Sequence, residues 1–264
     1  MTQTTKQIGE LLRDWRKRRH QSQLELAEQA EISQRHLSFL ESGRSLPSRE
    51  MLLRLARHLQ VPARERNALL LAAGFAPIAR ERSLDDPALL PARQAVELLL
   101  RAYEPFPALA IDRHWQLLSA NAGVMRLLHG VDPALLKPPL NVLRVSMHPQ
   151  GLAPRILNYG AWREHVLSRL ETQIEASRDA GLIALLGELK EYPIPDTSDG
   201  GERAPMALAG VAVPLQLASE RGVLSFLSTT TVFGTPVDIT LAELAIEAFL
   251  PADQATAAAL GAAN

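Results

Sequence analysis

The stretch 22–48 constrains the fold of this chain more than any other. Apolar residues recur at a spacing of three in two short segments of it, Leu24 and Ala27 and then Leu37 and Leu40. This spacing predicts two amphipathic helices. Only residues 30–33 separate them, so the two helices must cross sharply, as they do in a helix-turn-helix.

Serines precede both helices. Ser22 is followed three residues later by Glu25, which is the pattern of a capping box, and Ser33 can cap the second helix. The second helix then presents a polar first turn, with Gln34, Arg35, His36 and Ser38. Gln can pair with adenine and Arg with guanine, and recognition helices contact base edges mainly through their N-terminal residues. These four residues are candidates for reading DNA bases; the alternative is an ordinary solvated helix surface.

The same stretch and its flanks resemble the XRE-type helix-turn-helix of phage-repressor-like transcription factors. The matching residues include Gln23, Leu26-Ala27, Ile32-Ser33, Leu40-Glu41-Ser42-Gly43-Arg44, Pro47-Ser48, Leu52, Leu55-Ala56, Leu59 and Val61. The resemblance spans roughly residues 6–74 and implies an all-α five-helix DNA-binding domain. Glu31 stands where the family usually has Gly, so we expect either a left-handed backbone there at some energetic cost or an adjusted turn.

Basic residues follow the first predicted helix, 6–19, as the run Arg16-Lys17-Arg18-Arg19. Such a run complements the helix dipole, but four in a row exceed that need, so we expect some of them to contact phosphates. With the residues that the resemblance places beside the DNA backbone, the candidates for phosphate contact are Arg16, Arg18, Arg19, Gln23, Ser33 and Arg44.

The charge is divided unevenly along the chain. Residues 1–75 hold 13 Lys and Arg against 8 Asp and Glu, whereas residues 76–264 hold 15 against 21. A basic first part beside an acidic remainder fits a polyanion-binding domain joined to a domain with another task. Prolines and charged residues between the two indicate a linker. We therefore expect a DNA-binding domain in 1–75, a linker in 76–91 and a second domain in 92–264.

Composition excludes several classes of protein. The chain has no cysteine, which rules out disulfides and cysteine-ligated zinc. No apolar run approaches the roughly 18 residues of a membrane span, and the N-terminus lacks the apolar core of a signal peptide. We expect a cytoplasmic protein with no membrane partner.

The second domain mixes helices and strands. The patterns predict a helix over 92–103, a hairpin of 108–111 and 115–119, and helices over 122–128, 140–147, 152–177 and 182–191. Strands are predicted over 206–217, 223–233 and 243–250, the last of which could also be helical, and a closing helix from about 252. Asn121 is either the N-cap of helix 122–128 or a ligand contact. The expected fold is an α+β domain with an antiparallel sheet.

The segment IDRHWQLLSANAGVMRLL looks like the opening of a PAS-type sensor domain. The segments NVLRVSMHPQGLAPRILNYGAWREH and LSFLSTTTVFGTPVDITLAELAIEAFLPAD, placed after an XRE domain, resemble the MmyB-like ligand-binding domain over roughly residues 90–255. The resemblance implies a PAS-like domain that binds a fatty acid or a similar amphiphile. The fold alone indicates neither haem nor flavin, and we expect no cofactor.

Two groups of residues are candidates for ligand contact. A polar group, Arg144, His148, Arg155 and Asn158, could hold a carboxylate or phosphate at a pocket mouth; Arg155 and Asn158 are expected on one helix face. An apolar group could line a cavity: Leu117, Val124, Leu128, Leu143, Val145, Met147, Leu208, Val211, Val213, Leu224, Phe226 and Phe233. The alternatives are a structural network for the first group and a solid core for the second.

Enzyme motifs are missing. The sequence has no HExxH, GxSxG, GxGxxG or GxxxxGK[ST] pattern, so we expect neither a catalytic site nor a metal site. The combined prediction is a transcription regulator that binds a DNA operator and an apolar small molecule, as a homodimer on a palindromic site. The alternative is a DNA-binding regulator whose second domain is a ligand-free dimerisation or protein-docking module.

Overall fold

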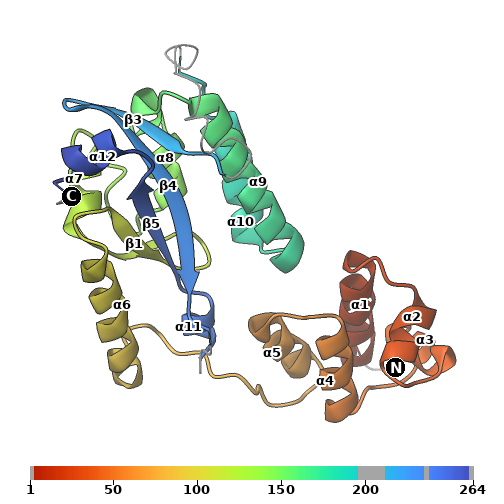
Figure 1. Cartoon of the computed structure of the whole chain (residues 1–264). Helices are drawn as coiled ribbons and strands as arrows, with labels where there is room; N and C mark the ends of the chain where they lie inside the picture. Colours follow the sequence, from red (N-terminus) through yellow and green to blue (C-terminus); the bar gives the residue numbers. More distant parts are fainter. Residues whose placement is uncertain (1–2, 196–211, 235–237, 262–264) are drawn as a thin grey trace. The chain divides into compact units, whose positions relative to one another are not determined.

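The computed structural model describes residues 3–195, 212–234 and 238–261. The chain separates into two compact units, one of Met1–Glu81 with Val237–Ile239 and the other of Arg82–Pro236 with Thr240–Asn264. Each unit has its own elements, which Figure 1 labels along the chain. Among the described residues no helix is both long and apolar enough to cross a membrane.

The N-terminal unit contains the five expected helices. They are α1 (Gln3–Arg18), α2 (Gln23–Gln29), α3 (Gln34–Glu41), α4 (Arg49–His58) and α5 (Ala63–Ala72). Apolar stripes of these helices meet in one core that includes Ile8, Leu12, Trp15, Leu26, Leu37, Leu40, Leu55 and Leu70. The 3.6-residue period of the sequence is therefore expressed as one small helical bundle.

Local sequence fixes where these helices begin. The predicted capping box forms, because the Ser22 hydroxyl accepts a hydrogen bond from the Glu25 backbone and Glu25 accepts one from the Ser22 backbone. The hydroxyls of Ser33 and Ser48 cap α3 and α4 in the same way. These bonds satisfy backbone donors that a helix start leaves free.

Two backbone features let α1, α2 and α3 pack closely. Glu31, between α2 and α3, has φ of 53°, which is the expected left-handed conformation. Gly9 of α1 lies against α3, where an added Cβ would stand only 2.5 Å from the carbonyl oxygen of Leu40. Any larger residue at position 9 would push α1 away from α3.

The second unit is built on one antiparallel sheet of five strands. These are β1 (Ala108–Ile111), β2 (Leu117–Ala120), β3 (Leu215–Ser219), β4 (Gly222–Val232) and β5 (Ala245–Pro251), in the order β2-β1-β5-β4-β3. Strand β5 therefore lies at the centre, with Glu247 opposite Leu109 of β1 and Thr230 of β4. This is the expected PAS-like α+β fold.

Helices cover both faces of this sheet. They are α6 (Leu90–Ala102), preceded by the 3-10 turn η1 (Pro87–Leu89), then α7 (Ala122–Leu127), α8 (Val142–Met147), α9 (Tyr159–Ser177), α10 (Ala180–Glu191), α11 (Ile239–Ala242) and α12 (Gln254–Ala259). One face packs on α6 through Val96, Leu100, Ala108, Ala110, Ile246 and Ala248. The other face packs on α8, α9 and α10 (Figure 1), and the space-filling view shows α6 (yellow) packed along the strands (blue).

The expected helix over 152–177 is wrong as a single element. A 3-10 turn, η2 (Ala153–Arg155), is followed by extended backbone at Ile156 before α9 starts. Ile156 forms a bridge with Leu217, and the Leu157 amide donates to the Gln216 carbonyl. The chain leaves the helical path here because its backbone extends the edge of the sheet. Arg155 and Asn158 consequently do not share one helix face.

Other bounds differ less. Helix α6 begins at Leu90, two residues inside the expected linker. The segment 245–251 is a strand, so its helical alternative is wrong, since alternate residues face the two sides of the sheet. The strand expected over 206–217 is seen from Leu215 onward, and residues 206–211 lie outside the described ones.

Candidate functional site

The first turn of α3 carries the polar surface that the sequence singled out. Gln34, Arg35 and His36 are exposed, and Ser38 is half-buried. On the opposite side of the helix, Leu37 and Leu40 have no exposed surface and fix α3 to the bundle. The helix thus holds three long polar side chains free at its N-terminal end, the end through which recognition helices contact bases.

Phe39 positions two of the basic side chains. Its ring is half-buried, and the guanidinium carbons of Arg35 and Arg44 lie 5.4 and 5.6 Å from the ring centre. Contacts of this kind stabilise a cation over an aromatic face. Arg35 on α3 and Arg44 in the following loop therefore flank one aromatic side chain while both remain exposed.

Arg16 is placed differently from the other basic candidates. It is only 8% exposed, and its Nε and Nη2 donate to the two carboxylate oxygens of Glu41 at 2.6 and 2.8 Å. Gln23 donates its side-chain amide to the same carboxylate at 2.8 Å. This network ties α1, α2 and α3 together, so the Arg16 guanidinium is engaged inside the bundle.

The remaining candidates for phosphate contact also differ in whether their side chains bind other parts of the bundle or lie at the surface. Arg19 donates from Nε and Nη2 to the carbonyls of Leu59 and Gln60, at 2.9 and 3.0 Å, and so caps the end of α4. Arg18 lies over the Trp15 ring at 4.6 Å and is half-buried. Ser33 is exposed while its hydroxyl caps α3. The structure therefore brings Ser33 and Arg44 to the surface and commits Arg16 and Arg19 to the fold.

An apolar cavity lies in the second unit, between the sheet and helices α7, α8 and α9. The volume of this cavity is about 90 Å³. The lining is formed by Leu109, Trp115, Leu117, Val124, Leu127, Leu128, Leu140, Val142, Leu143, Val145, Ser146, Leu152, Trp162, Val166, Arg169, Leu215, Glu247 and Phe249. Five residues of the predicted apolar group are among them, namely Leu117, Val124, Leu128, Leu143 and Val145.

The other predicted apolar residues lie elsewhere. Met147, Leu224 and Phe226 are buried in the core beside the cavity, and Val213 packs against that core. Phe233 packs against the cluster on the α6 face. Leu208 and Val211 lie outside the described residues.

The polar residues that line the cavity, Ser146, Arg169 and Glu247, were not among the residues predicted from the sequence. Glu247 is 3% exposed and accepts hydrogen bonds from Arg169 of α9, from Nη2 at 2.7 Å and Nη1 at 3.3 Å, and from the Thr230 hydroxyl at 2.8 Å. In the same lining, the Trp162 indole N–H donates to the Ser146 hydroxyl at 3.0 Å. A signal existed for Glu247, because it is the only charged residue in the apolar segment 245–251.

The predicted polar group does not come together at this cavity. Arg144 donates to both carboxylate oxygens of Glu188 on α10, at 2.8 and 2.7 Å, and this hydrogen bonding lowers the pKa of Glu188. Tyr192 donates to Glu188 at 2.5 Å, and its ring stands nearly perpendicular to the His148 ring, with the ring centres 5.1 Å apart. Burial raises the pKa of Tyr192. The cluster fastens α8 to α10.

Arg155 and Asn158 have separate structural partners. Arg155 donates from Nη1 to the carbonyls of Leu127 and His129, at 2.9 and 3.1 Å. Asn158 donates to the Pro214 carbonyl at 2.7 Å and accepts from the Gln216 amide at 3.1 Å, so it attaches the start of α9 to β3. None of the four predicted polar residues lines the cavity.

Asn121 is the N-cap of α7. Its side-chain oxygen accepts hydrogen bonds from the backbone of Val124 and Ala108, at 3.3 and 3.1 Å. Its amide nitrogen donates to the carbonyls of Leu100 and Phe106. All of these partners are backbone groups, so the residue joins α7, β1 and the end of α6.

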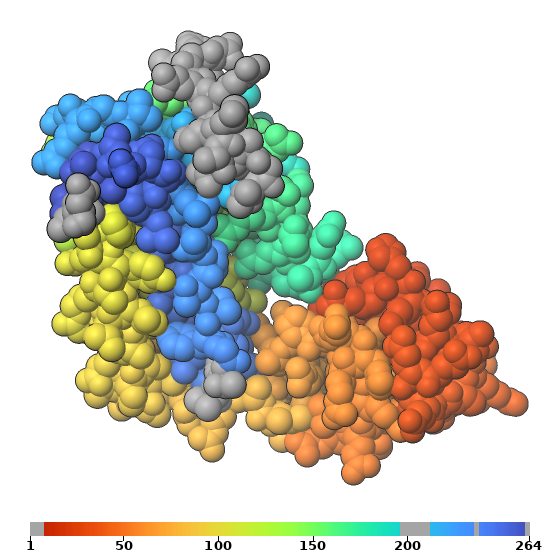
Figure 2. Space-filling model, in the orientation of Figure 1, coloured from red at the N-terminus to blue at the C-terminus, as the bar shows by residue number. Residues whose placement is uncertain are grey.

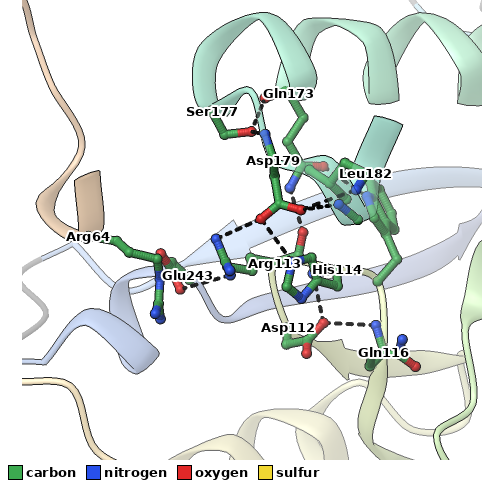
Figure 3. Close-up of polar contacts among 12 residues, drawn as sticks. Arg64, Asp112, Arg113, His114, Gln116, Gln173, Ser177, Asp179, Leu182 and Glu243 are labelled. Atoms are coloured by element: carbon green, nitrogen blue, oxygen red, sulfur yellow. Dashed lines mark hydrogen bonds and ion pairs between the residues drawn. The ribbon is translucent and has the colours of Figure 1, made fainter. Parts of the chain in front are cut away.

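A polar network joins the turn between β1 and β2, which precedes the cavity, to the end of α9 (Figure 3). Asp179, between α9 and α10, lies 3.0 Å from both the Arg113 guanidinium and His114 Nε2 in the β1–β2 turn. Burial alone would raise the pKa of Asp179, but the hydrogen bonds from His114 and the Leu182 backbone and the charge of Arg113 outweigh it and lower the pKa. The turn is thereby held against the end of α9.

Gln173 of α9 completes this support. It donates to the Arg113 carbonyl at 2.7 Å and accepts from the Trp115 indole N–H at 2.8 Å. Trp115 itself has φ of 64°, a conformation that is strained for a bulky residue and persists only where its surroundings fix it. In this structure the network therefore holds Trp115 as part of the cavity wall.

Comparisons with known proteins divide the chain in the same two parts. Residues 7–69 match the family model of a helix-turn-helix domain, and residues 92–263 match that of the MmyB-like transcription regulator ligand binding domain. A curated relative, the ImmF control region 10 kDa protein of Bacillus phage phi105, is 43% identical over 51 residues, which are 19% of this chain and 57% of the relative. The chain thus spans little more than half the length of that relative.

Two solved structures of the clp gene regulator ClgR of Corynebacterium glutamicum are also similar. One is 28% identical and covers 28% of this chain and 92% of the other, and the second is 25% identical and covers 39% and 97%; both have a TM-score of 0.25.

Both matched families describe transcription regulators and not enzymes. Within the described ranges, no three His, Asp or Glu side chains gather as metal ligands would. The ligand-binding model covers well over half of the chain, so this protein belongs to the MmyB-like transcription regulators and is a DNA-binding regulator with a ligand-binding domain.

Proposed function

We propose that the N-terminal unit reads a specific operator through the first turn of α3. The observation that carries this proposal is the exposure of Gln34, Arg35 and His36 on a helix that Leu37 and Leu40 anchor in the bundle. Arg35 suits guanine and Gln34 suits adenine, because each can form two hydrogen bonds with the edge of that base. Ser38 and His36 supplement these contacts.

The proposed phosphate contacts are Ser33, Arg44, Gln23 and Arg18. The first two are exposed, and the other two are half-buried beside α3 and at the end of α1. We leave Arg16 and Arg19 out of this set because their guanidinium groups bind Glu41 and the end of α4. They position the DNA-binding surface instead. Gln23 stays in the set because its side-chain amide uses one N–H on Glu41 and has a second. One such surface makes few contacts, so we propose that a homodimer binds a palindromic operator in the cytoplasm.

We further propose that the second unit binds an apolar small molecule, with a fatty acid or similar amphiphile as the candidate class. The support is a cavity lined mainly by aliphatic side chains with a few polar ones, Ser146, Arg169 and Glu247, the composition typical of ligand sites. Binding in this cavity and binding of DNA must then alter each other's affinity by the same factor.

The DNA-reading proposal is tested by selecting an operator from random duplexes with the full chain. Arg35→Ala should weaken binding to that operator by about 1–3 kcal/mol and relax the preference at one base pair. Arg57→Ala, which removes an exposed arginine from α4, is the matched control and should keep the base preference. An unchanged preference in Arg35→Ala would contradict the assignment of Arg35 to base reading.

The ligand proposal is tested by mass spectrometry of an organic extract of the purified chain, followed by operator titrations with and without the molecule found. A stoichiometric amphiphile that shifts operator affinity supports a sensor. The competing function is a ligand-free dimerisation or docking module. The small volume of the cavity and the complete burial of Met147 and Phe226 support this alternative. An empty extract and no response to added amphiphiles would favour that module.

A further inference from the structure

The size of the cavity limits how a ligand can bind. Its volume is about 90 Å³, whereas an apolar cavity known to take up benzene has a volume of about 150 Å³. With the walls as they stand, only a few carbon atoms of a ligand fit inside. The rest of a larger molecule must occupy a neighbouring space, and a wall residue must move to connect the two.

A second hollow adjoins the cavity along α9. This open groove has a volume of about 420 Å³ and is lined by Trp115, His165, Ser168, Arg169, Thr172, Gln173 and Ala176. Trp115 and Arg169 also line the apolar cavity. These two side chains therefore form the partition between an apolar interior and a polar groove.

The partition is held by contacts that can change. The guanidinium carbon of Arg169 lies 4.8 Å from the centre of the Trp115 ring. Arg169 uses Nη1 and Nη2 to bind Glu247 and Thr230, and within the described residues its Nε makes no hydrogen bond. About a third of its side chain is exposed, so it reaches both the groove and the cavity.

The groove has a definite charge preference. Among the described residues, Arg169 is its only charged lining residue and no carboxylate lines it, because Glu247 lies on the cavity side and is nearly fully buried. Burial and the positive charge of Arg169 lower the pKa of His165, whose buried Nε2 has no hydrogen-bond partner among the described residues. Ser168 and Thr172 add hydroxyl groups. These groups suit a negatively charged head.

We propose that Arg169 and Trp115 form the portal of the cavity, and that Arg169 binds the anionic head group of an amphiphile whose tail passes Trp115 into the apolar interior. This inference rests on the proposed ligand-binding function and adds to it a head-group site in the α9 groove. A guanidinium can bind two carboxylates at once through different N–H groups, so the head group binds without separating Arg169 from Glu247.

The test compares probes of equal chain length that differ only in the head group: octanoate, 1-octanol and methyl octanoate. Their affinities are measured by calorimetric titration of the full chain. Arg169→Gln should lower the affinity for octanoate roughly tenfold or more, since a hydrogen bond to a charged group is lost. The affinities for 1-octanol and methyl octanoate should stay within about twofold of the wild-type values. Arg163→Gln, on α9 but outside both hollows, is the matched control.

Two further variants keep the result decisive if Arg169→Gln folds poorly. Arg169→Lys retains the charge and should restore part of the octanoate affinity. Arg169→Gln combined with Glu247→Gln removes both charges, leaves no buried carboxylate unpaired, and should still bind octanoate no better than 1-octanol. Circular dichroism spectra check the fold of each variant.

The possible outcomes separate the two proposals. Equal losses for octanoate and 1-octanol, or no loss for octanoate, would overturn the head-group role of Arg169 while leaving a ligand-binding cavity in place. Binding of none of the three probes to the wild-type chain would overturn both the portal and the proposed apolar ligand. Trp115→Leu should accelerate association and dissociation of 1-octanol, and unchanged rates would overturn the role of Trp115 as a portal.

Discussion

The two units each contain a two-point Arg–Glu pair, and the pairs differ in their surroundings. In the N-terminal unit, Arg16 and Glu41 have side chains only 10% and 2% exposed. In the second unit, Glu247 is comparably buried at 4%, but Arg169 is 32% exposed and borders a cavity. The shortest N–O distances are 2.6 and 2.7 Å, so the chemistry of the two pairs is nearly the same.

The difference shows how packing decides the role of an ion pair. Around Arg16, the side chain of Gln23 and the carbonyl of Gln21 complete the hydrogen bonds, and the core closes on the pair. Such a pair can only hold the fold. Around Arg169, one side is protein and the other is a hollow, so the guanidinium has room for a further partner. The first pair is structural, and the second can serve recognition as well.

The largest expected effect is on the N-terminal pair. Glu41→Ala leaves the Arg16 charge buried without its partner and should lower the free energy of unfolding by about 3–5 kcal/mol. Urea denaturation followed by circular dichroism measures it. The double variant Arg16→Met with Glu41→Leu replaces both charges by apolar groups and should recover most of the loss. A loss of stability below about 1 kcal/mol in Glu41→Ala would mean that this buried pair contributes no more than an exposed surface ion pair.

A smaller effect is expected for the pair in the second unit. Glu247→Ala removes hydrogen bonds to Arg169 and Thr230 and should cost about 1–3 kcal/mol of stability. The loss is smaller than in Glu41→Ala because water can solvate the half-exposed Arg169 once its partner is gone. The same urea titration compares Glu247→Ala with Glu41→Ala. Equal losses of stability would contradict the proposed difference between the two Arg–Glu pairs.

The network that supports Trp115 should depend on pH. The pKa of Asp179 is lowered in the folded protein, so its contribution is fully present above the ordinary value of 3.8 and is lost as the pH falls through the lowered one. Asp179→Asn keeps a capping side chain for α10 but loses the charge. It should cost up to about 1 kcal/mol at neutral pH and progressively less below pH 3.8.

Urea titrations at several pH values measure this difference between Asp179→Asn and the wild-type chain. Asp132→Asn is the control, because its carboxylate accepts a backbone hydrogen bond from Ala134 and has no ion pair among the described residues. A cost for Asp179→Asn that stays constant down to strongly acidic pH would contradict the assigned role of the carboxylate.

The smallest effect is expected at Glu31, the exposed one of the two strained turns. Glu31, exposed with φ of 53°, carries a left-handed strain of roughly 1–2 kcal/mol that Gly would relieve, offset by about 0.4–1 kcal/mol of added unfolded-state entropy. Glu31→Gly should therefore raise stability by about 0.5 kcal/mol. Thermal denaturation should show a slightly higher midpoint. Trp115→Gly should destabilise instead, because the buried Trp115 ring packs in the wall.

Local patterns predicted much of this molecule. The capping serines and the helix period depend only on residues three or four apart in the chain, and all five N-terminal helices formed as expected. The break before α9 was missed because it results from pairing with β3, some 60 residues away. No local pattern in the segment 152–158 predicts the pairing with β3.

The same contrast between local patterns and long-range contacts applies to the candidate sites. For α3, exposure follows from one helical period, so sequence alone placed Gln34, Arg35 and His36 on the surface. Arg16 and Arg169 are both arginines on amphipathic helices, and composition does not tell which will be buried against a carboxylate. Their roles depend on Glu41 and Glu247, which lie 25 and 78 residues away in the chain.

The sequence by itself determined the two-part organisation, the five-helix bundle, the recognition helix and the α+β character of the second unit, because these depend on short-range period, capping and charge. Only the tertiary structure decided which polar residues reach the cavity. Strand order puts β5 at the centre of the sheet, and this places Glu247 opposite Arg169 of α9. A buried charge must find its partner across the fold, and that partner is chosen by packing rather than by proximity in sequence.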